Sequence, residues 1–201
     1  MKFLEGFNSG TVIYFDADRN IDKIDMEKLL DTNIMDRNII DRLVISIPKN
    51  WRDVLDEVGS VIRGSKGNEV MIIVDSLPSI FLGEQRLLLK DLETMRKKKV
   101  EEFTGNIISF MMGLRHILRL HNNAIFILLN QLRGRVRCID KSFWASKGYI
   151  PAFWNLIQGY TDACILLEKI RRGLLYVRVI FSYFMPEVLG IIKMAEDLKI
   201  S

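Results

Sequence analysis

Two short apolar runs, each ending abruptly in polar side chains, constrain the fold of this chain more than any other feature. They are Val70–Ser76 and Ala124–Gln131, which close with Asp75-Ser76 and Asn130-Gln131. Runs this rich in branched residues are typical of strands buried on both faces, as in a parallel sheet covered by helices. Because open α/β sheets bind ligands at the carboxyl ends of their strands, we expect these polar residues to lie at the functional edge.

The remaining apolar segments alternate between the spacing of strands and the spacing of helices. Further strands are expected at Thr11–Phe15, Leu43–Ile47, Ala163–Leu167, Leu174–Phe181 and Val188–Met194. Helices are expected at Ile21–Leu30, from a cap at Asn50 to about Ile62, around Gln85–Lys99, and from about Asn106 to His121. This alternation predicts an α/β fold with a mainly parallel sheet, helices on both faces and right-handed crossovers. The last two strands are close enough in sequence to form an antiparallel C-terminal extension.

The composition predicts one globular domain, residues 1–201, because 49% of the 201 residues are apolar and 27% are charged. No apolar run approaches the roughly 18 residues that cross a bilayer. Residues 1–10 carry no apolar signal region, so we expect neither membrane insertion nor secretion. Cys138 and Cys164, the two cysteines, have no metal-ligand spacing and suit a reducing compartment.

The positive charge is concentrated in one segment. Residues 133–149 contain five cations and one acid, Asp140, so this segment alone carries the net charge of +4 found for the whole chain. Cations interleaved with aromatic rings suit single-stranded nucleic acid, because the cations follow the phosphates and the rings stack on bases. The candidate DNA-binding residues are Arg133, Arg135, Arg137, Lys141, Phe143, Trp144 and Lys147. In the alternative interpretation, the rings dock on a partner or on the core, and the cations are merely solvated.

A second basic run, Arg96–Lys99, is interpreted as a solvated helix end, where positive charge complements the helix dipole. Nuclear import or phosphate contact are its alternatives.

The order of these pieces resembles the core of RecA-type recombinases, especially the eukaryotic and archaeal branch and its paralogues. The segment Tyr14–Asp18 is similar to the strand of that family that ends Tyr-Ile-Asp-Thr-Glu, and Ile73–Leu77 is similar to its magnesium-side strand. The helix at 106–121 followed by Asn130-Gln131 matches the family's long helix and its Asn-Gln strand end. Pro151-Ala152, with Trp154 close behind, resembles the paralogues' Pro-Ala-Leu-Gly-x-x-Trp in a shortened form without its glycine. Ser182–Glu187 resembles the family's Ser-Pro-x-x-Pro-Glu near the end of the core. The resemblance implies a RecA-like three-layer sandwich whose disordered DNA-binding loop corresponds to residues 132–149.

Two departures from the family pattern bear on activity. A phosphate loop needs Gly-x-x-x-x-Gly-Lys-Ser/Thr between a strand and a helix. The nearest approach, Gly59–Lys66, transposes the lysine and the serine and leaves a helix to enter a strand. In the family this loop precedes the strand that the Tyr14 segment resembles, so we expect a core truncated at the N-terminus. Asp18 stands where active members carry the glutamate that activates water, and a misplacement of about 1 Å can lower a rate roughly 100-fold.

The resemblance therefore implies a degenerate recombinase paralogue, similar to those of Shu complexes, that is not an enzyme and needs no cofactor. Such a protein is expected in the nucleus, where it assists homologous-recombination repair by binding single-stranded DNA, a partner paralogue in a heterodimer, and the strand-exchange recombinase. The degenerate catalytic candidates are Asp18, Asp75 and Gln131. From the residues alone, Asp75 is interpreted as a strand-end carboxylate that caps nearby amides, and Gln131 as shaping the start of the basic segment.

Two alternatives stay open. An ATPase would use Asp18 and Asp75 with magnesium and ATP, and its phosphate loop would come from upstream sequence or from another chain. A pure protein-interaction adaptor would bind partners without contacting DNA.

Overall fold

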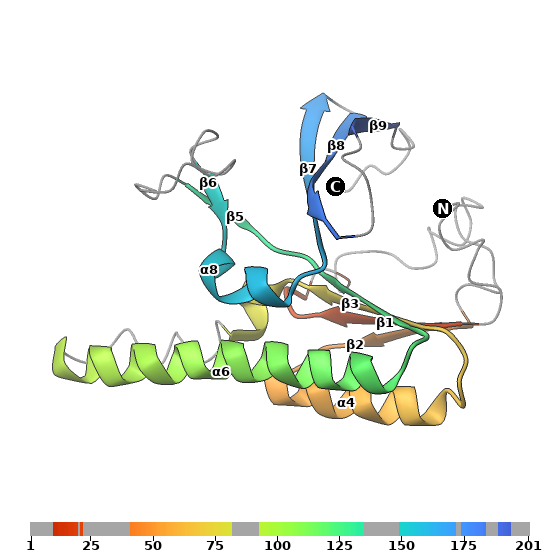
Figure 1. Ribbon diagram of the computed structural model, residues 1–201, viewed down its shortest axis with the longest axis horizontal. Coiled ribbons are helices and arrows are strands. Elements are labelled where there is room, and N and C mark those ends of the chain that lie inside the picture. The colour runs from red at the N-terminus through yellow and green to blue at the C-terminus, as the bar shows by residue number, and fades with distance from the viewer. Residues whose placement is uncertain are drawn as a thin grey trace.

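The computed structural model describes residues 10–19, 21, 41–81, 93–134, 149–171, 174–183 and 189–193. In this part of the chain, four strands form one sheet in the order β2-β1-β3-β4 (Figure 1). The strands are β1 (Thr11–Asp16), β2 (Leu43–Ser46), β3 (Val70–Asp75) and β4 (Ala124–Leu128). Every pairing among them is parallel. The α/β fold with a mainly parallel sheet is therefore confirmed.

Two long helices cover the same side of this sheet, α4 (Trp51–Gly64) and α6 (Glu93–Leu120) (Figure 1). Side chains alternate along a strand, and the alternation turns Ile13, Phe15 and Ile72 toward the helices, where all three are completely buried. The helices contribute the other half of this core, including Val54, Val58, Ile107, Phe110 and Leu114. The central strands β1 and β3 are continuous apolar runs because their helix-facing residues pack in this core, while Val12 and Met71 on their other face are also buried.

Helix α4 begins as its sequence predicts. The side-chain oxygen of Asn50 accepts hydrogen bonds from the backbone N–H groups of Arg52, at 2.8 Å, and Asp53, at 3.3 Å. These are donors that the first turn of a helix leaves without partners. The helix ends at Gly64, slightly beyond the predicted end at Ile62.

Helix α6 corrects the prediction of two separate helices at Gln85–Lys99 and Asn106–His121. It runs without interruption from Glu93 to Leu120. Gly105 weakens a helix by only about 1 kcal/mol relative to alanine, and no proline stands nearby to end one. The basic run Arg96–Lys99 consequently lies near the amino end of α6, and the prediction that it stands at a helix carboxyl end is wrong. The amino end of α6 projects past the sheet (Figure 1).

The C-terminal strands form a separate three-stranded antiparallel sheet in the order β7-β8-β9. They are β7 (Ala163–Arg171), β8 (Leu174–Ser182) and β9 (Leu189–Lys193). This sheet lies on the opposite side of the parallel sheet from α4 and α6 (Figure 1). The predicted antiparallel extension is confirmed, and it also includes β7, which pairs with β8. The helix predicted at Ile21–Leu30 lies, apart from Ile21, outside the described residues.

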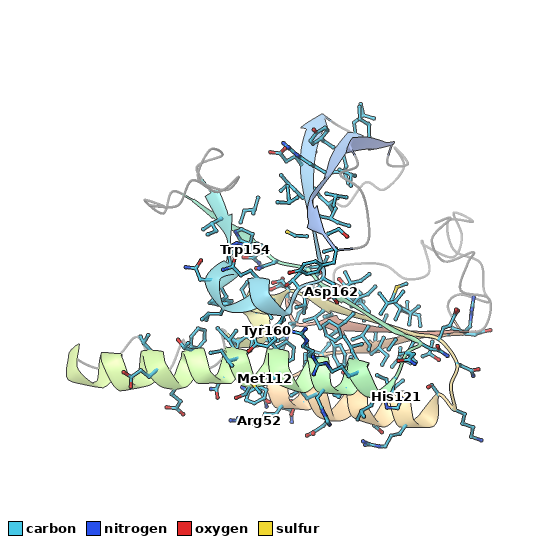
Figure 2. All side chains as sticks on the ribbon, in the orientation of Figure 1. Arg52, Met112, His121, Trp154, Tyr160 and Asp162 are labelled. Carbon is cyan, nitrogen blue, oxygen red and sulfur yellow. The ribbon has the colours of Figure 1, made fainter. Side chains whose placement is uncertain are left out.

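A short segment connects the two sheets and returns the chain to α6. It consists of β5 (Leu132–Gly134), β6 (Tyr149–Pro151), α8 (Trp154–Ile157) and the 3-10 turn η2 (Gln158–Tyr160). Figure 2 shows Trp154 and Tyr160 of this segment above α6, and both side chains pack against the core. In the part of the chain that the structure describes, no helix has both the length and the apolar character to cross a membrane.

Candidate functional site

Strands β1, β3 and β4 all end at the same edge of the parallel sheet, so the structure brings the predicted site residues of these strands together. Asp16 and Asp75 are in register on β1 and β3. Asp18 lies in the turn that follows β1, and its backbone N–H donates to the Asp75 carbonyl at 3.3 Å. Gln131 follows β4 and is exposed. This carboxyl edge is the place where a ligand of an open α/β sheet is expected.

The Asp75 carboxylate accepts a hydrogen bond from the phenol hydroxyl of Tyr14. Tyr14 lies two residues before Asp16 on β1, so its side chain points to the same face of the sheet as Asp16 and Asp75. Burial, the hydrogen bond to Asp75 and the nearby carboxylate charges raise the pKa of Tyr14 above its usual value, with burial the largest cause. The sequence predicted amide partners for Asp75, and the structure instead gives its side chain a hydroxyl partner.

A second set of hydrogen bonds links Asp18 to Gln131. The Ser79 hydroxyl donates to Asp18 and lies 3.0 Å from the Ser76 hydroxyl. The Gln131 amide nitrogen in turn donates to Ser76 at 3.3 Å. Ser76 is buried, and residues 77–81 form a helical turn that carries Ser79 back toward β1. The ends of β1, β3 and β4 are therefore joined by one chain of polar side chains.

Asp16 is completely buried, and its side chain accepts a hydrogen bond from the Ile21 backbone N–H at 2.7 Å. No motif in the sequence marked Asp16, Tyr14 or Ser79 as a site residue, and Ser76 was expected at the functional edge without a role of its own. The available signal was position: Tyr14 and Asp16 alternate on one face of β1, and Ser76 and Ser79 flank the start of a helical turn marked by Pro78. The register that joins them to Asp75 is not visible in the sequence.

The segment that comes nearest to a phosphate loop does not lie at this edge. Gly59–Gly64, the nearest approach to a phosphate loop, lies inside α4, and Ser65–Gly67 form the turn after it. A helix carboxyl end presents carbonyl oxygens and the negative pole of the helix dipole, which disfavour phosphate. No group of three or more His, Cys, Asp or Glu side chains in the described ranges is placed to hold a metal ion. Asp18 and Asp75 instead each hold a hydroxyl of their own chain.

The basic segment begins and ends beside this edge. Strands β5 and β6 pair antiparallel, with Gly134 opposite Tyr149. The Gln131 carbonyl accepts from the Ala152 N–H at 2.9 Å, and the Asn130 side chain donates to the Ala152 carbonyl at 2.8 Å. The predicted DNA-binding residues Arg135, Arg137, Lys141, Phe143, Trp144 and Lys147 lie outside the described residues, and of Arg133 only the backbone, on β5, is described.

Aromatic packing anchors the far end of this segment. Phe153, which follows β6, contacts Phe103 of α6 with ring centroids 5.5 Å apart, and Phe81 at 6.4 Å. The Arg115 guanidinium of α6 donates to the Gly159 carbonyl at 3.2 Å. Phe153 has φ of 58°, a left-handed conformation that is rare for an aromatic residue. The chain thus turns sharply at Phe153 onto α6.

No protein-family model matches the sequence, and no curated protein matches it either. Among solved structures, the chain is similar to a crystal structure of the RadB recombinase. The two align with a TM-score of 0.59 and 16% sequence identity over 92% of this chain and 76% of that chain. The chain has a RecA-like fold. At this identity the similarity shows the fold alone, and the parallel sheet with a separate antiparallel sheet at the C-terminus is the arrangement shared with RadB.

Proposed function

We propose that this chain is a non-catalytic RecA-like protein that assists homologous-recombination repair in the nucleus, by binding single-stranded DNA and a partner paralogue. One observation carries the non-catalytic part of the proposal: Asp18 and Asp75 each accept a hydrogen bond from a hydroxyl of the same chain. The 201 residues also contain no phosphate-loop motif. The RecA-like fold, shared with a protein described as a recombinase, supports the connection to recombination.

At the carboxyl edge, the Asp18 and Asp75 carboxylates have hydrogen-bond partners within this chain. Tyr14 supplies the hydroxyl for Asp75, and Ser79 supplies the one for Asp18. We therefore expect magnesium and ATP to leave the thermal unfolding temperature of the purified chain unchanged. A ligand at 100 times its Kd stabilises a protein by about 2.7 kcal/mol, an effect that calorimetry detects easily. Such a rise in the unfolding temperature would favour the ATPase alternative and contradict the proposal.

Single-stranded DNA binding is assigned to the basic segment, which starts and ends beside the carboxyl edge at β5 and β6. Binding through all five of its cations predicts a log–log dependence of the association constant on salt with a slope of roughly −3.5. Replacing Arg133, Arg135 and Arg137 with glutamate is expected to bring the slope toward zero and to weaken binding at least tenfold. Fluorescence anisotropy with a labelled oligonucleotide measures both quantities.

A matched control carries the same charge change at the other end of the molecule. Arg63, Lys66 and Arg119 are exposed and lie at or near the carboxyl ends of α4 and α6, away from the carboxyl edge of the sheet. The triple glutamate variant of these residues is expected to retain its salt slope. Equal binding by both triple variants, or no binding by the unaltered chain, would favour the adaptor alternative.

The partner of this chain is proposed to be a related RecA-like protein. An additional protein surface is supported by exposed apolar residues on the described strands or directly after them, among them Ile125, Leu129, Ile165 and Leu167. Expression alone is expected to give self-associating or poorly soluble protein, and co-expression with the partner a monodisperse heterodimer. Light scattering coupled to size-exclusion chromatography distinguishes the two, and a monodisperse, cooperatively unfolding monomer would contradict an obligate partner.

A further inference from the structure

The two edges of the parallel sheet differ in how they are protected from other strands. Natural edge strands are usually short, or carry lysine, proline or bulges that prevent pairing with another chain. Strand β2, at one edge, has only 4 residues, and Pro48 follows shortly after it. Strand β4, at the other edge, has 5 residues, no charge and no proline, and pairs with β3 in unbroken register.

The first strand of the C-terminal sheet provides a further contrast. Strand β7 also lies at an edge, but its pairing with β8 is irregular between Cys164 and Ile165 and again between Lys169 and Arg171. It also carries the exposed Lys169. Strand β7 therefore has two of the usual protections, and β4 has none of them.

The backbone of β4 presents hydrogen-bonding groups to the open side. The Leu129 N–H donates to the Val74 carbonyl at 3.0 Å. Every second residue counted back from Leu129 therefore points its backbone N–H and C=O toward β3. Because backbone groups of successive residues point to opposite sides of a strand, those of Phe126 and Leu128 point to the open edge. Within the described residues, the sheet order places no strand beyond β4. An extended segment has backbone groups with the spacing needed to pair with this row.

The side chains along β4 set the chemistry of that segment. Ala124, Phe126 and Leu128 pack against the core on the helix side. On the opposite face, Ile125 is 43% exposed and Leu129 is 37% exposed. A strand that pairs here meets an apolar, uncharged surface on both faces of the sheet, so its own residues are expected to be apolar and free of charge.

We propose that a β-strand of the partner protein pairs with β4 and extends the parallel sheet of this chain. This inference rests on the proposed function for the identity of the partner, and it assigns the place and the manner of contact. Strand addition gives affinity through main-chain hydrogen bonds and specificity through the alternate side chains, here Ile125 and Leu129.

The test is a pair of matched lysine substitutions at the two edges of the sheet. Ile125→Lys places a charge on β4, and Val44→Lys places one on β2 at a similar exposure, 40% against 43%. Both positions are exposed, so both variants are expected to fold, as checked by thermal unfolding. Co-expressed with the full-length partner identified by mass spectrometry, Ile125→Lys is expected to lose at least tenfold in partner recovery, and Val44→Lys to bind as the unaltered chain does.

Hydrogen exchange provides the second measurement. The Phe126 and Leu128 amides are expected to exchange at least tenfold more slowly in the complex than in the isolated chain. Slow exchange of both amides in the dilute isolated chain would show that a segment of the same chain covers β4, and concentration-dependent protection there would indicate a second copy. Either result overturns the inference.

The same measurements separate this inference from the proposed function. If the partner binds both lysine variants equally, strand pairing at β4 is wrong while the proposed function stands. If the unaltered chain recovers no RecA-like partner, the proposed function is wrong, and the proposed pairing of a partner strand with β4 is wrong as well.

Discussion

Substitution of Asp75 tests whether this carboxylate has a structural role or a catalytic one. Hydrogen bonds to charged groups contribute about 1.5–3 kcal/mol to stability, and Asp75 accepts one from Tyr14. Because Tyr14 is only half-buried, water replaces part of the lost bond, and the lower part of this range applies. We expect Asp75→Ala to destabilise the protein by about 1.5–2 kcal/mol. At roughly 2–4 °C per kcal/mol for a domain of this size, its unfolding temperature falls by about 3–8 °C.

Asp75→Asn is the informative companion, because it keeps an oxygen that accepts the Tyr14 hydrogen bond. A neutral hydrogen bond contributes about 0.5–1.5 kcal/mol, so the loss is about 1 kcal/mol. The substitution also removes the repulsion between Asp75 and Asp16, which are in register on neighbouring strands, and this gain offsets part of the loss. We therefore expect Asp75→Asn to unfold within a few degrees of the unaltered chain and to keep its activity in a recombination-repair assay.

A double-mutant cycle measures the hydrogen bond between Tyr14 and Asp75 directly. Tyr14→Phe and Asp75→Ala are expected to show a coupling energy of about 1.5 kcal/mol in urea unfolding, because each removes the same hydrogen bond. A coupling below about 0.5 kcal/mol would refute the bond. An Asp75→Asn variant that folds normally but loses all repair activity would refute the structural interpretation of Asp75.

Three further predictions concern stability. The pKa of Tyr14 is raised in the folded chain, so its contribution to the free energy of unfolding is complete below the usual pKa of about 10. That contribution is lost as pH rises above this value, because the unfolded chain then releases the proton first. The urea midpoint should fall between pH 10 and 11, and should fall less steeply in Tyr14→Phe. Asn50→Ala removes the cap of α4 and should destabilise by about 1 kcal/mol, whereas Asn50→Ser should restore most of the loss. A Cβ on Gly113 would lie 2.8 Å from the Leu55 side chain, but one on Gly105 meets nothing within 4 Å. In thermal unfolding, Gly105→Ala should therefore stabilise by about 0.5–1 kcal/mol, and Gly113→Ala should destabilise by about 1 kcal/mol once the close contact outweighs that gain; a stabilised Gly113→Ala would show that Leu55 moves aside freely.

The strands of the parallel sheet were predictable because each is a continuous apolar run that ends in polar residues, as Val70–Asp75 does. The start of α4 was predictable because Asn50 is a strong capping residue in front of an amphipathic pattern. The two-helix prediction for α6 was wrong because Gly105 and the charged residues around it resemble a break, although neither stops a helix that packs along its length. Local patterns thus determined the elements wherever one strong signal was present.

The contacts within the site were not predictable in the same way. The bond between Tyr14 and Asp75 depends on the register of β1 against β3, and that between Ser79 and Asp18 depends on where a helical turn carries Ser79. Register follows from the packing of the whole sheet and not from either strand alone. The position of β4 at an edge of the described sheet was not predictable either, because its sequence resembles that of a central strand.

The pairing of β5 with β6 has an entropic consequence for the basic segment. Bringing the two ends of a long segment together restricts the chain, and the free energy required grows with the logarithm of the segment's length. Here Gly134 lies opposite Tyr149 in a ladder that forms with the fold, so closure is complete before any ligand arrives. The proposed binding of nucleic acid therefore does not have to supply the free energy of this closure, and lengthening the segment between β5 and β6 by a few residues should alter the affinity little.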